Sequence, residues 1–277
     1  MILQGDALTM LQSLPDESVD MAMTSPPYYC VRSYLAGTHP DKPLEIGLEP
    51  SSDDYLRRLL AVFSEVKRVL RAGGTCWVNL ADSYSGSNGG LPSPMGVKLR
   101  RYGYTLPPRP RGTIPRKSLC LIPYRFAIAM VRQGWLLRNV IIWNKPNAVP
   151  ESVTDRFTND FEYLFFFAKS PRYYFKQQFE AATNRGRRRG GSYVRNKRCV
   201  WPIPTKGFAG NHFAAYPDTL VEVPIAAGCP QGGIVLDPFL GSGTTALAAR
   251  RLGRRWIGIE LNPAYVTMAE QRLAGCG

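Results

Sequence analysis

Four consecutive residues near the amino end of the chain could hold a planar amine. Ser25, Pro26, Pro27 and Tyr28 directly follow the apolar run at residues 19–24. The two prolines stiffen the turn and remove backbone donors, which leaves carbonyl groups as acceptors. The Ser25 hydroxyl and the Pro26 carbonyl can then accept both hydrogens of an exocyclic NH2 group, while Tyr28 offers a face on which a planar base can stack. An ordinary Pro-Pro turn is the alternative for this segment taken alone.

A second turn, near the carboxyl end, could hold a nucleoside. Asp237 follows the apolar run at residues 234–236, and a G-x-G-x-x-A pattern begins at Gly241. Glu260 stands about 20 residues further on, where a carboxylate accepts hydrogen bonds from ribose hydroxyls. Asp237 would repel the pyrophosphate of a dinucleotide and attract a cation. The pattern therefore favours S-adenosylmethionine, and a glycine-rich turn without a ligand is the alternative.

The elements that must position these turns alternate between strands and helices. Apolar runs predict seven strands, at residues 2–4, 19–24, 75–80, 136–143, 162–168, 234–236 and 255–259. Helical spacing and capping residues predict helices at residues 53–70, 123–133 and 217–227 and after residue 262, with Gly73 and Gly74 ending the first of them. Such alternation predicts an α/β fold with a seven-stranded, mostly parallel sheet, helices on both faces and an antiparallel pair of strands at one edge.

The order of the two turns constrains this fold. The single β-α-β unit at the carboxyl end cannot complete a sheet, so strands from the amino-terminal part must complete it. Because the carboxyl ends of parallel strands meet at one edge of a sheet, we expect the turns at residues 25–28 and 237–245 to lie side by side.

Composition describes a globular and strongly basic chain. The chain has 277 residues, of which 44% are hydrophobic, and its formal net charge is +14. No apolar run reaches the roughly 18 residues of a membrane span, and the amino end has no secretory signal, so we expect a cytoplasmic protein. The six cysteines are scattered without a C-x-x-C pair, and only two histidines accompany them. This pattern speaks against a zinc site, and we expect no metal.

Two long segments, residues 83–118 and 176–210, carry much of the positive charge and match neither periodicity. Basic residues mixed with glycine, proline and aromatics favour a polyanionic partner, although a solvated tether is the alternative for the arginine run. In the second segment the expected phosphate contacts are Arg187, Arg188, Arg189, Lys197 and Arg198.

The motifs together resemble those of the amino-methylating DNA methyltransferases. T-S-P-P-Y at residues 24–28 resembles their catalytic motif, and D-P-F-L-G-S-G-T-T at residues 237–245 resembles their cofactor motif. The order, catalytic before cofactor, resembles the permuted beta class. The resemblance covers most of the chain and implies a Rossmann-like, circularly permuted methyltransferase fold that binds S-adenosylmethionine.

The resemblance also implies further site residues. Residues 5–6 resemble a motif near the cofactor adenine, and residues 211–217 resemble one that lines the methionine end of the cofactor. Residues 142–147, with 151–152 and 161–163, resemble the motif beside a flipped-base pocket. The cofactor contacts implied in this way are Asp6, Phe213, Asp237, Pro238, Phe239, Gly241, Gly243, Thr244 and Glu260.

The organisation implied is a single methyltransferase domain over residues 1–277. We expect its catalytic part at residues 1–175 and its cofactor part at 211–277. Residues 83–118 and 176–210 are the candidate insertions for DNA contact and target recognition.

The activity implied is methyl transfer to an exocyclic base amine in double-stranded DNA, with the base flipped out of the duplex. A serine at position 25 is typical of cytosine N4 methylation, whereas the adenine N6 enzymes more often have aspartate or asparagine. We therefore expect N4-cytosine, with N6-adenine as the alternative. Methylation of RNA or of a protein amide, and a catalytically silent DNA-binding protein on the same fold, are further alternatives. The target site, a homodimer, a cognate restriction endonuclease, and a bacterial or phage host stay open.

Overall fold

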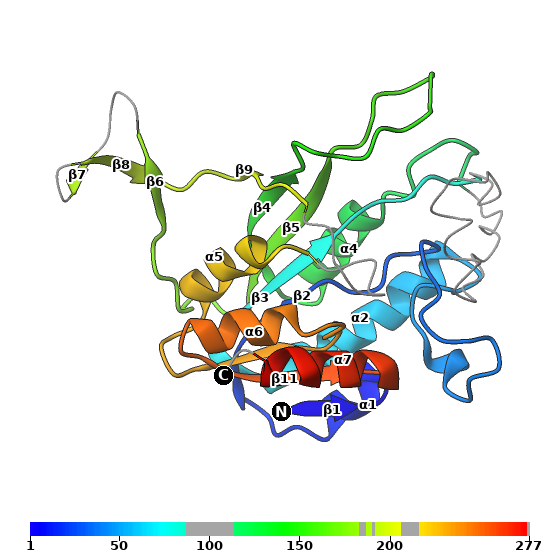
Figure 1. Ribbon diagram of the computed structural model, residues 1–277, viewed down its shortest axis with the longest axis horizontal. Coiled ribbons are helices and arrows are strands. Elements are labelled where there is room, and N and C mark those ends of the chain that lie inside the picture. Colours follow the sequence, from blue (N-terminus) through cyan, green and yellow to red (C-terminus); the bar gives the residue numbers. More distant parts are fainter. Residues whose placement is uncertain (87–113, 183–186, 190–191, 206–215, 276–277) are drawn as a thin grey trace.

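A mixed β-sheet forms the centre of the molecule, with helices on both of its faces (Figure 1). The computed structural model describes residues 1–86, 114–182, 187–189, 192–205 and 216–275. Within these ranges the sheet has eight strands, in the order β1-β11-β10-β2-β3-β5-β4-β9. They are β1 (Ile2–Gln4), β2 (Val19–Thr24), β3 (Leu70–Leu80), β4 (Leu136–Asn144), β5 (Phe161–Ala168), β9 (Val200–Pro202), β10 (Ile234–Asp237) and β11 (Arg255–Glu260).

The strand pairing is parallel from β1 to β3 and antiparallel where β5 joins. β5 is antiparallel to both β3 and β4, which confirms the expected antiparallel pair. β10 pairs with β2 in parallel, with Val235 opposite Met21 and Leu236 opposite Ala22. The two terminal parts of the chain therefore complete one sheet, as the order of the two turns predicts.

The expected count of seven strands is wrong by one, because β9 adds an eighth. Ile142 lies opposite Val200 and Trp143 opposite Trp201, so this three-residue strand extends the sheet beyond β4. Its side chains include Trp201, which is 5% exposed and joins a core cluster. A strand this short has too few residues for an alternating pattern, and pairing with β4 is what makes it a strand.

Helices cover the sheet on two sides. The helices are α1 (Ala7–Gln12), α2 (Ser52–Val69), α4 (Ile122–Arg132), α5 (Asp218–Gly228), α6 (Thr244–Arg251) and α7 (Pro263–Ala274), with a short 3-10 helix η1 (Lys42–Leu44). Alternate residues of β2 face opposite sides: Ala22 packs in the cluster with α1, α2 and α4, whereas Met21 and Met23 pack in the cluster with α5 and α6. Both faces of the sheet are thus buried, as a parallel sheet requires. None of the helices in the described ranges is long and apolar enough to cross a membrane.

The start of α2 matches the sequence expectation, but its end does not. The Ser51 hydroxyl accepts a hydrogen bond from the Asp54 backbone N–H at 3.1 Å, which caps the helix. The helix ends at Val69, and Gly73 and Gly74 lie inside β3 instead of ending the helix. Their carbonyl groups accept hydrogen bonds from the backbone of Lys169 and Tyr174, in the segment that follows β5.

A second, smaller sheet stands apart from the first. It consists of β6 (Phe179–Ala181), β8 (Ser192–Asn196) and β7 (Arg187–Arg189), with β8 antiparallel to both neighbours. Figure 1 shows this small sheet projecting away from the main sheet. Residues 176–210, a candidate insertion in the sequence, therefore contain both the small sheet and β9.

Close packing of α5 against β3 provides a test of the fold. A Cβ atom at Gly228 would lie 2.5 Å from Thr75 Oγ1 and 2.6 Å from Trp77 Nε1, both of which are buried. We expect Gly228→Ala to lower the free energy of unfolding by about 1–3 kcal/mol, because a packed core cannot absorb an added methyl group. Urea denaturation measures the change. At Gly37 a Cβ would meet nothing within 4 Å, so Gly37→Ala is the matched control. Equal stability of the two variants would contradict this packing.

Candidate active site

The two turns singled out in the sequence meet at the carboxyl edge of neighbouring strands. β2 ends at Thr24 and β10 ends at Asp237. The Thr24 hydroxyl donates a hydrogen bond to Asp237 Oδ1 at 2.6 Å. This bond joins residues that are 213 positions apart in sequence. It holds the turn at residues 25–28, called the amine-binding turn below after its predicted role, beside the glycine-rich turn.

The Asp237 carboxylate is buried and saturated with hydrogen bonds. Besides Thr24, its donors are the Phe239 backbone N–H at 3.0 Å, the Thr245 hydroxyl at 2.6 Å and the Tyr216 hydroxyl at 3.2 Å. Burial raises the pKa of Asp237, and the hydrogen bonds from its neighbours oppose that shift. All four donors belong to the protein, and Asp237 does not line the pocket described below. Its direct contact with a bound cation stays a prediction.

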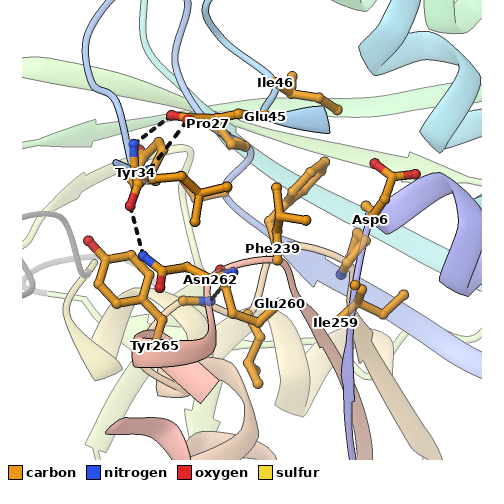
Figure 2. A pocket seen from close by; sticks show the side chains of 18 of the residues that line it. Asp6, Pro27, Tyr34, Glu45, Ile46, Phe239, Ile259, Glu260, Asn262 and Tyr265 are labelled. Atoms are coloured by element: carbon orange, nitrogen blue, oxygen red, sulfur yellow. Dashed lines mark hydrogen bonds between the residues drawn. The ribbon is translucent and has the colours of Figure 1, made fainter. Parts of the chain in front are cut away.

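The pocket beside this carboxylate combines segments from the two terminal parts of the chain, residues 5–46 and 216–265 (Figure 2). Asp6 follows β1, Ser25 follows β2, and Glu260 ends β11, while Tyr34 and Glu45 come from the connection between β2 and α2. Further lining residues are Gly5, Ala7, Pro27, Leu35, Leu44, Ile46, Tyr216, Pro238, Phe239, Leu240, Gly241, Ser242, Thr244, Ile259, Leu261, Asn262 and Tyr265. The pocket therefore has apolar walls and a few acidic groups.

The charge of the pocket distinguishes between possible ligands. Among its described lining residues Asp6, Glu45 and Glu260 are acidic, and none is lysine, arginine or histidine. Glu45 is ion-paired with Lys42, whereas Asp6 and Glu260 have no basic side chain beside them in the described lining. Such a lining disfavours a phosphate and suits a nucleoside that is neutral or cationic. The pocket thus supports the sequence argument against a dinucleotide.

Glu260 is held in place at the floor of the glycine-rich turn. The Gly241 backbone N–H donates to Glu260 Oε2 at 2.8 Å, and the Asn262 backbone N–H donates to Oε1 at the same distance. Burial raises the pKa of Glu260 to about 7, against the effect of these hydrogen bonds. Asn262 is fixed in turn, because its side chain donates to the Tyr34 carbonyl at 2.8 Å.

The glycine-rich turn owes its shape to two left-handed residues. Gly241 has φ +53° and lines the pocket, whereas Gly243 has φ +85° and precedes the first residue of α6. A Cβ at Gly243 would lie 3.1 Å from the Cβ of Ala269 on α7. Gly243 therefore permits close helix packing behind the pocket instead of lining it.

The amine-binding turn divides between the pocket and a polar cluster. Ser25 and Pro27 line the pocket, while Pro26 is buried and Tyr28 lies outside the lining. The Tyr55 hydroxyl on α2 donates to the Pro27 carbonyl at 2.8 Å and fixes the turn. The Ser25 hydroxyl donates to the Tyr28 hydroxyl at 3.4 Å.

The polar cluster lies across four adjacent strands. The Tyr28 hydroxyl donates to Glu162 Oε2 at 2.5 Å and lies 3.1 Å from Asn79 Oδ1. Glu162 also accepts from the Asn79 side chain at 3.0 Å and forms an ion pair with Lys145. Burial, and then the charge of Glu162, raises the pKa of Tyr28. A chain of hydrogen bonds therefore runs from Ser25 through Tyr28 to a buried carboxylate.

Sequence reasoning did not assign roles to several members of these groups. In the sequence, Asn79 and Glu162 each stand out as a single polar residue within an apolar strand. In the structure both side chains are at least nine-tenths buried. Tyr34 and Glu45 lie in a stretch without periodicity, and only the fold brings them to the pocket. Of the predicted cofactor contacts, Phe213 lies outside the described residues.

The predicted phosphate contacts lie on and around the small sheet. Arg187, Arg188 and Arg189 form β7, for which the structure describes the backbone only. Arg198 pairs with Glu180 at 2.6 Å, and the Lys197 ammonium lies 5.0 Å from the centre of the Trp201 ring. Their contact with DNA stays a prediction.

Comparisons with known proteins agree with this geometry. The profile of a family described as DNA methylase matches residues 19–271. The Type II methyltransferase M.Cfr9I of Citrobacter freundii is 44% identical over 274 residues, which cover 99% of this chain and 87% of that protein.

Two solved structures are similar along nearly the whole chain. The PvuII DNA methyltransferase, described as cytosine-N4-specific, has a TM-score of 0.68 at 20% identity, over 98% of this chain and 85% of its own. A structure from Thermus thermophilus is described as a DNA modification methylase complexed with S-adenosyl-L-methionine. It has a TM-score of 0.63 at 25% identity, over 99% of this chain and 94% of its own.

The raised pKa of Glu260 predicts how its contribution to stability depends on pH. In the folded protein Glu260 keeps its proton up to about pH 7, whereas the unfolded chain releases it near pH 4.5. The unfolded state binds fewer protons in this window, so stability falls as pH rises from 5 to 8. We expect the parent to lose up to about 3 kcal/mol relative to Glu260→Gln across this range. Urea denaturation of both proteins at each pH measures the difference, and a constant difference would contradict the assignment.

Proposed function

This chain belongs to the DNA methylase family, and we propose that it methylates the exocyclic N4 amine of cytosine in double-stranded DNA. It is a DNA methyltransferase that uses S-adenosylmethionine, and the choice of base is the proposal. One observation carries the transfer to an exocyclic amine: Ser25 and Pro27 line the same pocket as Gly241 and Glu260. The choice of cytosine rests on the serine at position 25, which resembles the N4-cytosine enzymes. An amine held by the first turn would thus lie next to a methyl donor held by the second.

The residues of the pocket suit S-adenosylmethionine, which supplies an electrophilic methyl group when bound. Glu260 is positioned by two backbone N–H groups and can accept hydrogen bonds from ribose hydroxyls. Asp6 and the apolar side chains of Phe239 and Ile259 belong to the same pocket and can enclose an adenine ring. The absence of basic side chains among the described lining residues favours a ligand without phosphate. Asp237 supports the site by holding the turn that Phe239 belongs to.

Ser25 is suited to accept an amine hydrogen. Its own hydroxyl hydrogen points to the Tyr28 hydroxyl, so the lone pairs of Ser25 Oγ remain available for the amine. The Pro26 carbonyl is the second acceptor. Together they hold both hydrogens of the NH2 group, which aims the nitrogen lone pair at the methyl group. The Tyr28 ring packs partly against the core, and its remaining face is the one that would stack on the base while its hydroxyl is held in the polar cluster.

The hydrogen-bond chain also offers a path for the proton that the amine must lose. Methyl transfer would form an N–CH3 bond as the S–CH3 bond of the donor breaks, and it would leave the nitrogen with one proton more than the product holds. That proton can pass to Ser25 Oγ while Ser25 gives its own to the Tyr28 hydroxyl and Tyr28 gives its own to Glu162. Each residue except Glu162 ends with the number of protons it began with. A serine is too weak a base to keep a proton, so the path to a carboxylate suits a serine at this position.

The target-recognition region and the biological partners follow from the same proposal. We assign DNA contact to the small sheet of β6, β7 and β8, where the predicted basic residues lie. Arg195 and Arg198 both form ion pairs with Glu180. These pairs lower the pKa of Glu180 to about 2 and hold the two arginine side chains beside the small sheet. Because M.Cfr9I is a Type II methyltransferase, we propose that this chain protects a site that a cognate endonuclease cuts in the bacterial or phage-infected cytoplasm. A homodimer stays a prediction.

Nucleoside analysis tests the proposed base. DNA of varied sequence is treated with the protein and isotopically labelled S-adenosylmethionine, digested, and analysed by mass spectrometry. We expect labelled N4-methylcytosine. Labelled N6-methyladenine would select the alternative base, and label in RNA or protein alone would refute a DNA substrate. Mapping the labelled positions then defines the target site.

Ser25→Ala tests the catalytic turn. We expect the variant to lose at least about 100-fold in the rate of methyl transfer, because one acceptor and the first link of the proton path disappear together. Affinity for S-adenosylmethionine, measured by calorimetry, should change little. Ser18→Ala is the matched control, since Ser18 donates to the Pro15 carbonyl at the opposite end of β2. Equal rates of Ser25→Ala and the parent would refute the assignment.

Tyr28→Phe separates stacking from proton transfer. The variant keeps the ring but removes the hydroxyl that links Ser25 to Glu162. We expect kcat to fall by about 10- to 100-fold with KM for DNA nearly unchanged. Tyr124→Phe removes a hydroxyl whose partner is Tyr163, and it serves as control. An unchanged kcat in Tyr28→Phe would contradict proton transfer through the hydroxyl and would leave it only the role of positioning the ring.

A further inference from the structure

The connection between β4 and β5 exposes apolar side chains near the catalytic turn. This segment, residues 145–160, is called the β4–β5 loop below. Phe157 is 95% exposed, Val149 74% and Val153 40%. A single exposed apolar residue is ordinary on a protein surface, so exposure alone indicates nothing. The place of these residues in the fold is what gives them significance.

Both ends of the β4–β5 loop lie at the polar cluster of the active site. The Lys145 backbone N–H donates to the Asp160 carbonyl at 2.6 Å, which closes the base of the loop. The Lys145 side chain pairs with Glu162, the carboxylate that accepts from Tyr28. The loop therefore rises directly from the residues that hold the stacking tyrosine.

Several contacts on its flanks brace the loop. Arg156 pairs with Glu151 at 2.5 Å, and its guanidinium lies 4.2 Å from the centre of the Tyr84 ring. Asp155 pairs with Lys117 at 2.6 Å. Residue 147 adds a third brace, because the Asn147 side chain donates to the Thr205 carbonyl at 2.9 Å and accepts from its N–H at 2.8 Å. Exposure of Phe157 is thus a property of a braced loop.

Charged side chains near Phe157 in the β4–β5 loop are held in ion pairs. Glu151 and Asp155 are both engaged by basic partners within or beside the loop. Arg156, the basic neighbour of Phe157, is held by Glu151, so the fully exposed group at this point of the loop is the aromatic ring of Phe157. Figure 1 shows the small sheet projecting at the left of the view and the β4–β5 loop at the upper right. A duplex that delivers a base to Ser25 would come close to the β4–β5 loop, because both ends of this loop lie beside Tyr28 and Glu162.

We infer that Phe157 inserts into the base stack of the DNA duplex beside the flipped base. The inference rests on the proposed function, in which the target base must leave the duplex to reach Ser25. Extrusion of a base costs unpairing and unstacking, and it leaves a gap in the stack. An apolar side chain that enters the stack offsets that cost, as the apolar wedges of other DNA-binding proteins do. Phe157 is a positioning residue in this role, since it acts on the DNA and not on the reacting atoms.

Two duplexes test the inference, and both carry the site mapped by nucleoside analysis. In the first the target base is normally paired; in the second it lies opposite an abasic position and is already unpaired. We expect Phe157→Ala to lower kcat/KM on the paired duplex by about 10- to 100-fold, which is the range for loss of one stacked aromatic. On the abasic duplex the loss should shrink to about threefold or less. Phe157→Trp should retain most of the activity on both.

Ile128→Ala is the matched control, because Ile128 is 55% exposed on the outer face of α4. It should behave as the parent on both duplexes. An equal loss on the two duplexes, or no loss on either, would overturn the insertion of Phe157 while leaving the methyltransferase activity of the parent established. A parent that methylates neither duplex would overturn the proposed function and the inference with it. A change in solution molar mass of Phe157→Ala would assign the side chain to a subunit interface and would also overturn it.

Discussion

The active site depends on one buried carboxylate, that of Asp237. Its four donors come from the end of β2, the turn after β10, the start of α6 and the segment just before α5. A buried charge without partners would cost several kcal/mol, so these four segments are held in one arrangement. The arrangement includes both the amine-binding turn and the glycine-rich turn. The relative position of the two turns thus depends on the hydrogen bonds to Asp237, which lies outside the pocket lining.

Positive and negative charges lie in different parts of the molecule. The chain has a net charge of +14, but the described lining of the pocket is acidic. Basic side chains gather on segments outside the main sheet, where they can meet phosphates without reaching the methyl donor. Separation of the two charges lets one protein bind a polyanion and a cationic donor at once, because each ligand meets the sign that attracts it.

Tyr28 connects the turn at Ser25 with the architecture of the sheet. Its hydroxyl bonds to Glu162 on β5, and it follows β2, so β3 with Asn79 lies between the two. The antiparallel entry of β5 is what places the amino end of that strand at the carboxyl edge of β2 and β3. A parallel β5 would carry Glu162 to the opposite edge, and Ser25 would have no carboxylate within reach through Tyr28. The β4–β5 loop lies at the same edge for the same reason.

Local patterns in the sequence were enough to predict the two turns, seven of the eight strands of the main sheet and the start of α2. Prolines, glycines, caps and apolar periodicity act on their immediate neighbours, which is why these features can be predicted. The sequence also predicted that strands from both ends share a sheet, since the last β-α-β unit could not stand alone. It did not predict that Gly73 and Gly74 extend β3, that Val200–Pro202 forms a strand, or that Asp237 is enclosed by protein donors. These outcomes depend on partners that are distant in sequence, and no local pattern records which donor or strand will come to lie beside a residue.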